Sequence, residues 1–493
     1  MHAMNVVYPE IVLLTMALVI TLADLWVTDA ARRLTFWLTQ ATLAAVAAMH
    51  FAHFDGGQTL YGLQRMVVSD PMGHLLAGSA CIAVMLTVAY AQPYLASRDM
   101  LKGEFFTLTL FAALGISIMC SANHFLVVYL GLELMSLSLY ALTALRRDHA
   151  PAIEAAMKYF VLGALASGFL LYGLSMLYGA TGTLEIAKVY ERIAAGRINH
   201  DVLVFGLVFV VAGLAFKLGA APFHMWVPDV YHGAPTGVTL LIAGAPKLAA
   251  FAITMRLLVE GMGMPELAKE WQQMLIVLAI GSLAVGNLAA IAQTNLKRML
   301  AYSTIAQMGF LLLGMAVGVV GGNTFSGANA YSSAMFYIVT YVLTTAGTLG
   351  LVLHLSRAGH ECEEIADLAG LARRAPWLAG AMTLFMFSLA GIPPMVGFHA
   401  KLAVLQALVT TNVGLHLVLA VVAVLFSLVG AFYYLRVVKV MYFDDAVDQA
   451  PILRTQGLSA LLAVNGAAVL LLGLLPGGLM ALCRDAIVRA LAT

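Results

Sequence analysis

Long apolar runs follow one another along almost the whole chain of 493 residues, and they restrict its fold more than any other feature. A helix that crosses a bilayer needs about 20 mainly apolar residues. Only 10% of the residues are charged, whereas roughly 25% are charged in an ordinary soluble domain. The sequence therefore predicts an all-α polytopic membrane protein and excludes a soluble enzyme. We count 14 runs, at about 6–27, 34–54, 72–92, 104–121, 124–145, 152–178, 201–219, 236–259, 271–292, 299–319, 331–355, 377–410, 414–442 and 457–482.

Two of these runs need separate interpretation: one contains helix-breaking residues, and the other lies where a signal peptide would be. The run at 377–410 is too long for one straight helix and contains Gly391, Pro393 and Pro394, so we expect a break there. The first run has no basic segment before it and no cleavage site of small residues after it. It is therefore expected to be a retained helix and not a signal peptide.

The basic residues predict how the chain is oriented. When the runs cross alternately, 14 of the 26 Lys and Arg residues fall on the loops of one side and 8 on the other side. An excess of Lys and Arg marks the cytoplasmic side of a membrane protein. With an even number of crossings, both termini are then expected on the outer, periplasmic side. The remaining four basic residues are lysines within apolar runs.

The chain also contains an internal repeat. Residues 156–161 (AMKYFV) match residues 334–339 (AMFYIV), and the proline-broken stretch after Lys217 has a counterpart at 393–399. Five spans form each unit, and an odd number of spans repeated directly must be inverted in the membrane. Inverted repeats with discontinuous helices are typical of ion transporters. We predict a three-helix segment at 1–103, repeats at 104–260 and 261–443, and a C-terminal helix at 444–493.

Charged side chains lie in the middle of several runs. Placing a charge at the bilayer centre costs roughly 2.5–3.5 kcal/mol, so such residues face the bundle interior and often mark an ion path. Glu133, Lys217, Lys247 and Lys401 meet this description. We interpret them as a proton relay, because a buried lysine can take up and release a proton. The alternative is a static buried ion pair that fixes helix packing.

Other polar residues give weaker signals. Lys158 lies nearer the inner end of its run and could reach the membrane interface. Pro246 should free a backbone carbonyl beside Lys247. Glu10 is expected near the membrane interface. His50 and His53 are three residues apart on one helix, and a bis-histidine haem would need a facing partner, so we do not expect haem. The acidic residues at 361–367 are expected to form a solvated inner loop, with partner docking as the alternative.

No redox or nucleotide motif accompanies these charges. The four cysteines form no CxxC pair and no zinc spacing, and no GxGxxG or Walker A loop is present. The formal net charge is +1, so the sequence predicts no nucleic-acid partner. Chemistry with nucleotides or redox centres is expected on partner chains.

Four stretches carry a family resemblance: 131–140 (GLELMSLSLY), 217–229 (KLGAAPFHMWVPD), 295–303 (NLKRMLAYS) and 391–401 (GIPPMVGFHAK). The sequence resembles the antiporter-like proton-translocating subunits of NADH-quinone oxidoreductase, respiratory complex I. The N-type subunits are most similar, because the last apolar run ends about 11 residues before the C-terminus. We therefore do not expect the long lateral helix of the L-type subunits.

The resemblance implies roles for particular residues. Glu133 matches the family's fifth-helix glutamate and Lys217 its seventh-helix lysine, with which that glutamate pairs. Lys247 matches the central eighth-helix lysine, and Lys401 the twelfth-helix lysine. The family's connecting histidine and sixth-helix lysine correspond to His224 and Lys158.

The resemblance also implies partners and a location. It places FMN, the iron–sulfur clusters and quinone on partner subunits and none of them on this chain. Neighbours would be the membrane-arm subunits M, K, J and A, within membrane lipid, and the transported ion would be the proton. The expected location is the bacterial cell inner membrane. A subunit of a cation/proton antiporter or membrane-bound hydrogenase complex is the first alternative, and an inactive structural scaffold is the second.

Overall fold

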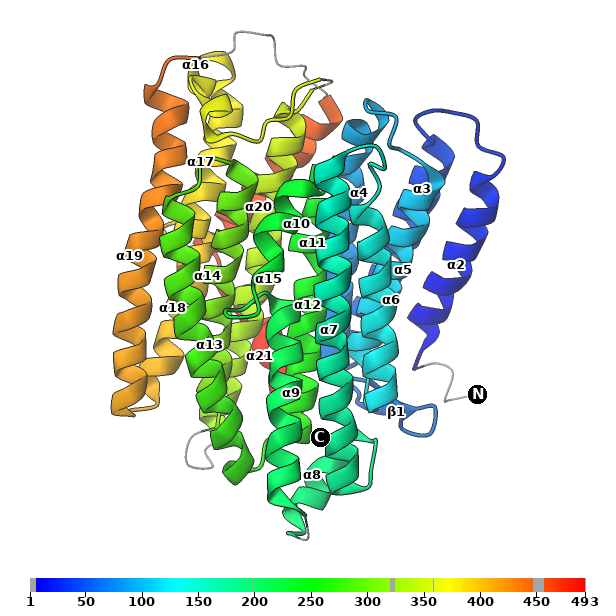
Figure 1. The fold of residues 1–493 in the computed structure, drawn as a ribbon, viewed down its shortest axis with the longest axis vertical. Helices are drawn as coiled ribbons and strands as arrows, with labels where there is room; N and C mark the ends of the chain where they lie inside the picture. The colour runs from blue at the N-terminus through cyan, green and yellow to red at the C-terminus, as the bar shows by residue number, and fades with distance from the viewer. Residues whose placement is uncertain (1–5, 197, 320–323, 358, 447–455, 493) are drawn as a thin grey trace.

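A bundle of long helices forms almost the whole molecule in the computed structural model, which describes residues 6–196, 198–319, 324–357, 359–446 and 456–492 (Figure 1). Twelve helical segments of the described chain are long and apolar enough to cross a membrane. They are α3 (Arg33–Gly56), α4 (Pro71–Ala96), α5 (Gly103–Ser121), α6 (Phe125–Thr143), α7 (Ala150–Thr181), α9 (His200–Leu218), the continuous series α11 (Thr236–Ala243), α12 (Ala245–Thr254) and η1 (Met255–Gly261), α13 (Pro265–Ile291), α14 (Leu296–Ala316), α15 (Thr324–Leu355), α19 (Gly414–Phe443) and α20 (Gln456–Leu474).

The other two predicted crossings are present in a different form. The first is α2 (Tyr8–Asp24), which has 17 residues. The second is the pair α17 (Pro376–Ala390) and α18 (Val396–Thr410), separated at the predicted glycine and prolines. The described helices thus account for all 14 predicted runs.

The bundle has two ends that carry different connections (Figure 1). We call one the α16 end, after the short helix α16 (Leu371–Arg374), which follows the one-turn helix η2 (Ile365–Leu368). We call the other the hairpin end, after the strands β1 (Leu60–Gly62) and β2 (Val67–Ser69), and it also carries α8 (Ile186–Ala194). The Arg-rich loops from α2 to α3, from α4 to α5 and from α6 to α7 lie together at the α16 end. Arg197 and Arg454, which contribute to the predicted charge asymmetry, lie outside the described residues.

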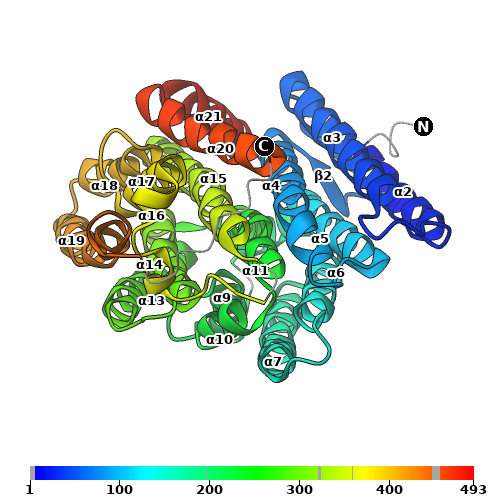
Figure 2. The ribbon, with the colours of Figure 1, turned by 90° about the horizontal axis from the view of Figure 1, so that it is seen from above.

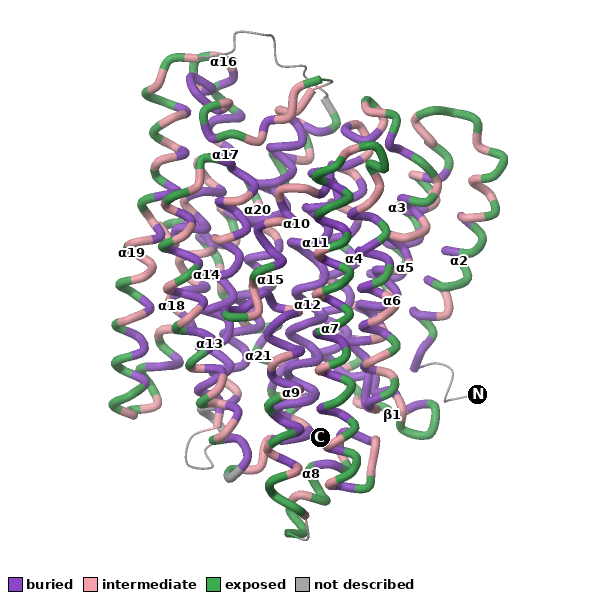
Figure 3. The backbone as a smooth tube through the Cα atoms, in the orientation of Figure 1, coloured by how far each residue is buried: buried purple, intermediate pink, exposed green. Residues whose placement is uncertain are grey.

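The core runs through the centre of the bundle (Figures 2 and 3). Within the most apolar 18-residue window, 100% of residues are buried in the α11–η1 series, 94% in α14 and 89% in α15, but only 28% in α19. Seen from above, α2 and α3 lie along one side and α19 on the opposite side (Figure 2). The buried lysines described below therefore have protein around them and not lipid.

Close glycine contacts occur between the first two helices of each predicted repeat. A Cβ atom on Gly115 would lie 2.6 Å from the carbonyl oxygen of Gly131, so α5 and α6 are in backbone contact. A Cβ atom on Gly286 would lie 2.5 Å from the backbone nitrogen of Ala306, so α13 and α14 are equally close. Small residues permit such approach in membrane bundles. Each helix pair opens one of the predicted repeats.

Several helices are broken, not all of them where the sequence indicated. α9 ends before Pro222 and is continued by α10 (Trp226–Gly233), as expected. The eighth crossing is also interrupted at Gly244 and changes to a π-helix at Met255–Gly261, which the sequence did not predict. The last crossing continues beyond α20 into α21 (Gly477–Leu491). Its break falls at Leu475 and Pro476, since proline removes a backbone donor.

Ion pairs connect the loops and helices at the hairpin end. Arg65 pairs with Glu185 at 2.5 Å, and Lys188 holds the same carboxylate at 2.6 Å. Burial alone would raise the pKa of Glu185, but the hydrogen bonds from Lys188 and Arg65 outweigh it and lower the pKa. Asp70 caps α4 through Gly73 and forms an ion pair with the buried Arg256 of η1 at 2.6 Å.

Candidate functional site

The break after α9 creates the first part of the site. Gly219 (φ +80°) donates its N–H to the carbonyls of Ala215 and Phe216, which ends the helix. The last carbonyls of α9 therefore have no helical partner. Trp226 donates its indole N–H to the carbonyl of Phe216 at 3.0 Å.

Lys247 occupies the remaining carbonyls. Its Nζ donates to the carbonyl oxygens of Lys217 at 3.2 Å and Leu218 at 2.9 Å, and it lies 5.3 Å from the centre of the Trp226 ring. The residue is 1% exposed. We expected the nearby carbonyl to be one freed by Pro246, and this was wrong. The ammonium reaches across to α9, because α12 packs against the end of that helix.

The second half of the molecule repeats this arrangement. Gly391 (φ +84°) ends α17 with N–H bonds to Phe387 and Ser388, in the same pattern as Gly219. Lys401 donates to the carbonyl of Ala390 at 2.9 Å and to Ser427 Oγ at 2.9 Å. Its Nζ lies 5.1 Å from the Phe310 ring. A buried lysine thus binds the open end of a broken helix in each half.

Lys217 lies beside the first break. Its Nζ donates to Ser136 Oγ at 2.9 Å and to Ser167 Oγ at 3.3 Å, on α6 and α7. In the second half, the carbonyl that matches that of Lys217 belongs to Leu389 and accepts from Gln307 at 2.9 Å. The second half therefore keeps the lysine at the break but has an apolar residue where the first half has Lys217.

Glu133 is not in direct contact with Lys217. Its Oε1 is buried and has no hydrogen-bond partner among the described residues. No described carboxylate lies within the 4.0 Å of an ion pair from the Lys217 nitrogen. The expectation of a contact pair was therefore wrong: Ser136, three residues along the same helix, takes the position next to the ammonium.

We call Glu133, Lys217, Lys247 and Lys401 the central row. Lys158 and His224 lie apart from it. Lys158 is 42% exposed and forms ion pairs at 2.7 Å with Glu154 and with Asp229. Asp229 in turn pairs with Arg298 at 2.8 Å. His224 follows the break after α9, is partly buried, and its Nδ1 has no partner among the described groups. The structure does not connect either residue to the buried lysines by a hydrogen bond.

Polar residues that the sequence analysis missed surround Lys401. A cavity of about 20 Å³ is lined by Gln307, Tyr337, Tyr341, Ser388 and Lys401, among others. A space of about 10–15 Å³ can hold one water molecule. Tyr337 donates to Gln307, and Tyr341 donates to Thr304 Oγ1 at 2.8 Å. Gln307 lies on α14 and the two tyrosines lie on α15, among mainly apolar residues, so no local motif marks them.

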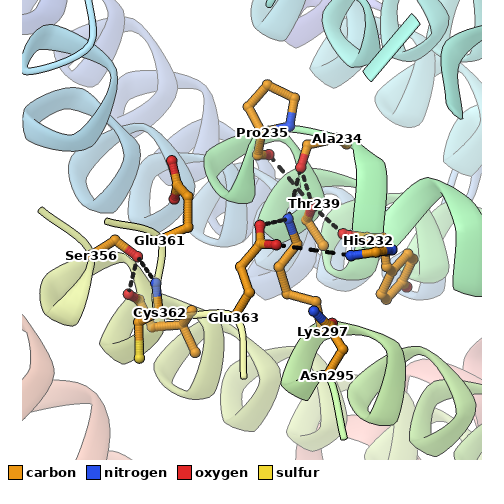
Figure 4. A network of polar contacts seen from close by, with 12 residues as sticks. His232, Ala234, Pro235, Thr239, Asn295, Lys297, Ser356, Glu361, Cys362 and Glu363 are labelled. Carbon is orange, nitrogen blue, oxygen red and sulfur yellow. Dashed lines mark hydrogen bonds and ion pairs between the residues drawn. The ribbon is translucent and has the colours of Figure 1, made fainter. Parts of the chain in front are cut away.

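Figure 4 shows a further network at the α16 end. Lys297 donates to the carbonyl of Ala234 and to Glu363 Oε1, both at 2.9 Å, and the other oxygen of Glu363 lies 3.9 Å from His232 Nε2. Glu361 pairs with Arg98 at 2.8 Å. The acidic loop is therefore not simply solvated: it binds basic residues of the bundle where α10 meets α11.

The fold and the buried lysines at two broken helices define an antiporter-like membrane subunit. The chain belongs to the family described as NADH:quinone oxidoreductase/Mrp antiporter, TM, whose family model matches residues 122–427. It is 63% identical to NADH-quinone oxidoreductase subunit N of Polaromonas naphthalenivorans, covering 98% of this chain and 96% of that protein. It is 60% identical to subunit N of Herminiimonas arsenicoxydans, covering 99% and 98%.

Solved structures show the same architecture. A chain of respiratory complex I from Thermus thermophilus with bound aureothin is 30% identical, with a TM-score of 0.79 over 96% of this chain and 98% of that chain. A chain of the Mrp complex from a Dietzia species is 20% identical, with a TM-score of 0.83 over 98% and 96%, and shows the likeness of fold.

Proposed function

We propose that this chain is the N-type proton-translocating membrane subunit of NADH-quinone oxidoreductase. Electrons pass from NADH to quinone in partner subunits, which carry the FMN, the iron–sulfur clusters and the quinone site. This chain carries no redox centre and moves protons through its buried glutamate and lysines. The identities to subunits N over nearly the full chain support this proposal.

The observation that carries the mechanism is the binding of Lys247 and Lys401 to the open ends of broken helices. A charged ammonium donates strong hydrogen bonds to these carbonyls, and bonds to charged groups contribute about 1.5–3 kcal/mol each. When the lysine releases its proton, these bonds weaken. Protonation is therefore linked to the geometry of the helix break, which gives distant electron transfer a way to drive proton movement.

We propose that Glu133, Lys217, Lys247 and Lys401 act in this order along the central row. Lys247 binds the backbone carbonyl of Lys217, so the two lysines share one helix break. Two like charges at one break repel each other, so a proton gained by one favours release by the other. Glu133, on α6, influences which of the two lysines holds the proton, although it is not in direct contact with Lys217. Lys401 lies at the far end, towards a neighbouring subunit.

Lys158 and His224 have supporting roles in this proposal. Lys158 lies with Asp229 and Arg298 towards the α16 end of the first half, where it would help protons enter from the adjoining aqueous phase. His224 has a free ring nitrogen beside the break after α9 and would connect the two halves. The partition of the chain into repeats at 104–260 and 261–443 belongs to the same proposal.

The proposal includes a location and partners. The subunit lies in the bacterial cell inner membrane with both termini on the periplasmic side, because the Arg-rich loops gather at the α16 end. Its neighbours are subunit M and the small subunits K, J and A. The exposed apolar residues of α2, α3 and α19 face these subunits or lipid.

The test is proton movement by the complex that contains this chain. Inverted vesicles are given NADH, and acidification is measured together with NADH oxidation. We expect acidification that needs NADH and quinone and does not need sodium. Exchange of sodium for protons without NADH would instead identify an antiporter complex and refute the redox-coupled proposal.

A further inference from the structure

A second set of buried polar side chains lies at the hairpin end, apart from Lys217, Lys247 and Lys401. It consists of Glu10 on α2, Ser117 on α5, His50 on α3, His74 on α4 and Ser69 on β2. All five are 1–8% exposed. Glu10 lies in the first turn of α2, is 8% exposed and faces α5. Four helices and the hairpin meet around this set.

These side chains touch one another in a single unbroken series. Ser117 donates to Glu10 Oε1 at 2.9 Å and contacts His50 Nε2 at 3.2 Å. The Nδ1 atoms of His50 and His74 lie 3.0 Å apart, and His74 Nε2 lies 2.6 Å from Ser69 Oγ. Each distance is that of a hydrogen bond. Five groups are therefore joined by four hydrogen bonds.

The contact between the two imidazoles fixes how protons are distributed. Two ring nitrogens 3.0 Å apart need one hydrogen between them, so one is a donor and the other an acceptor. His50 and His74 therefore cannot both be fully protonated in this arrangement. The pair has a place for one additional proton, which is the property of a relay and not of a permanent ion pair.

The surroundings leave the two ends of the series in different environments. At one end, Glu10 Oε2 is buried without a partner among the described residues, and Ser121 approaches Oε1 at 3.4 Å. At the other end, Ser69 adjoins Asp70, which pairs with Arg256. His53 stacks on His74 with ring centres 5.0 Å apart but bonds to the carbonyl of Met49.

We propose that Glu10, Ser117, His50, His74 and Ser69 form a second proton-transfer chain, which carries protons at the hairpin end during pumping. This inference rests on the proposed function of the subunit. The end of this proton-transfer chain at Ser69 adjoins Asp70, which pairs with Arg256 of η1. The π-helix η1 directly continues the helix that carries Lys247. The proton-transfer chain leads from there to α2, at the side of the bundle (Figure 2).

One transfer is balanced as follows. At the start Glu10 is a carboxylate, and the hydrogens of Ser117, His50 Nε2, His74 Nδ1 and Ser69 all point towards it. Ser117 gives its proton to Glu10 and takes the proton of His50 Nε2, while His50 Nδ1 takes the proton of His74 Nδ1. Ser69 gives its proton to His74 Nε2 and takes one proton from a hydronium ion that reaches it from the hairpin end, which leaves a water molecule. One proton has entered, Glu10 is neutral, and every hydrogen bond is reversed.

The experiment compares two serines on neighbouring helices. Ser117→Ala removes the hydroxyl that joins Glu10 to His50. Ser79→Ala removes a hydroxyl that, among the described residues, donates to the carbonyl of Leu75 in its own helix. Both variants are assembled in the complete complex, and NADH oxidation confirms assembly. We expect Ser117→Ala to lower NADH-driven acidification about 100-fold, the lower end of what one positioned proton-transfer group contributes, and Ser79→Ala to leave it unchanged.

A second variant reports on the proton itself. Glu10→Gln keeps the shape of the side chain and removes the group that takes the proton. In infrared difference spectra of the wild-type complex we expect a protonated carboxyl band that is absent from Glu10→Gln. Normal acidification in Ser117→Ala, or an unchanged band in Glu10→Gln, overturns the second chain. If Lys247→Ala also pumps normally, the proposed function itself fails; if only Lys247→Ala loses pumping, only the second chain fails.

Discussion

Replacing Lys247 by arginine separates a proton-carrying role from a static one. The ammonium donates to two backbone carbonyls, at 3.2 and 2.9 Å, from a position that is 1% exposed. Arginine keeps the positive charge and has enough donors for both carbonyls. A residue that only stabilises the end of α9 should therefore tolerate the change. Alanine would leave both carbonyls unpaired, at a cost of about 1–3 kcal/mol each.

A relay gives the opposite result. Lysine ordinarily has a pKa of about 10.4 and arginine of about 12.5 or more, a difference of at least roughly 2 pH units. At 1.36 kcal/mol for each unit, arginine is harder to deprotonate by about 3 kcal/mol, which is a factor of about 100 in rate. We expect Lys247→Arg to lose NADH-driven acidification nearly as fully as Lys247→Ala. The assay uses inverted vesicles with assembly checked by NADH oxidation, and near-normal pumping by the arginine variant would refute the relay.

Three further predictions follow from the contacts of other charged residues. Lys401→Leu should slow pumping while the complex still assembles, because it removes the only lysine at the second break in the described chain; unchanged acidification would take this residue out of the path. Glu133→Gln and Lys217→Met should together lose less pumping than the sum of their single effects, since Lys217 contacts Ser136, three residues after Glu133 on α6, and strict additivity would separate them. Arg256→Met should destabilise the complex by about 3–5 kcal/mol in thermal unfolding, because it leaves the buried carboxylate of Asp70 without a counter-ion. Arg65→Met, whose side chain is 49% exposed, should lose about 1 kcal/mol or less, and equal losses would contradict the burial argument.

The sequence was sufficient for the architecture, because membrane helices are specified by long local runs of apolar residues. The break beside Pro222 and the break near Pro393 could be predicted for the same reason: proline removes a hydrogen bond within its own helix. The interruption at Gly244 was missed, since an isolated glycine in an apolar run does not by itself end a helix.

The contacts of the site could not be derived in this way. Lys247 was recognised as buried, but its partners are carbonyls about 30 residues earlier in the chain. Ser136 was overlooked because a serine in a membrane helix ordinarily bonds to its own backbone. The set around Glu10 and His50 joins residues up to 107 positions apart. Only the packing of the helices brings such groups together, and this packing cannot be derived from local sequence patterns.

The most direct test of the central claim is the number of protons moved for each NADH oxidised by the purified, reconstituted complex. The variant Lys247→Met with Lys401→Met removes the ammonium from both broken helices. Lys102→Met is the matched control, because the side chain of that lysine is 47% exposed and its ion pair with Asp99 lies in the loop between α4 and α5. We predict a clearly lower ratio in the double variant and a ratio close to wild type in the control. An unchanged ratio in the double variant would show that protons do not pass through these lysines.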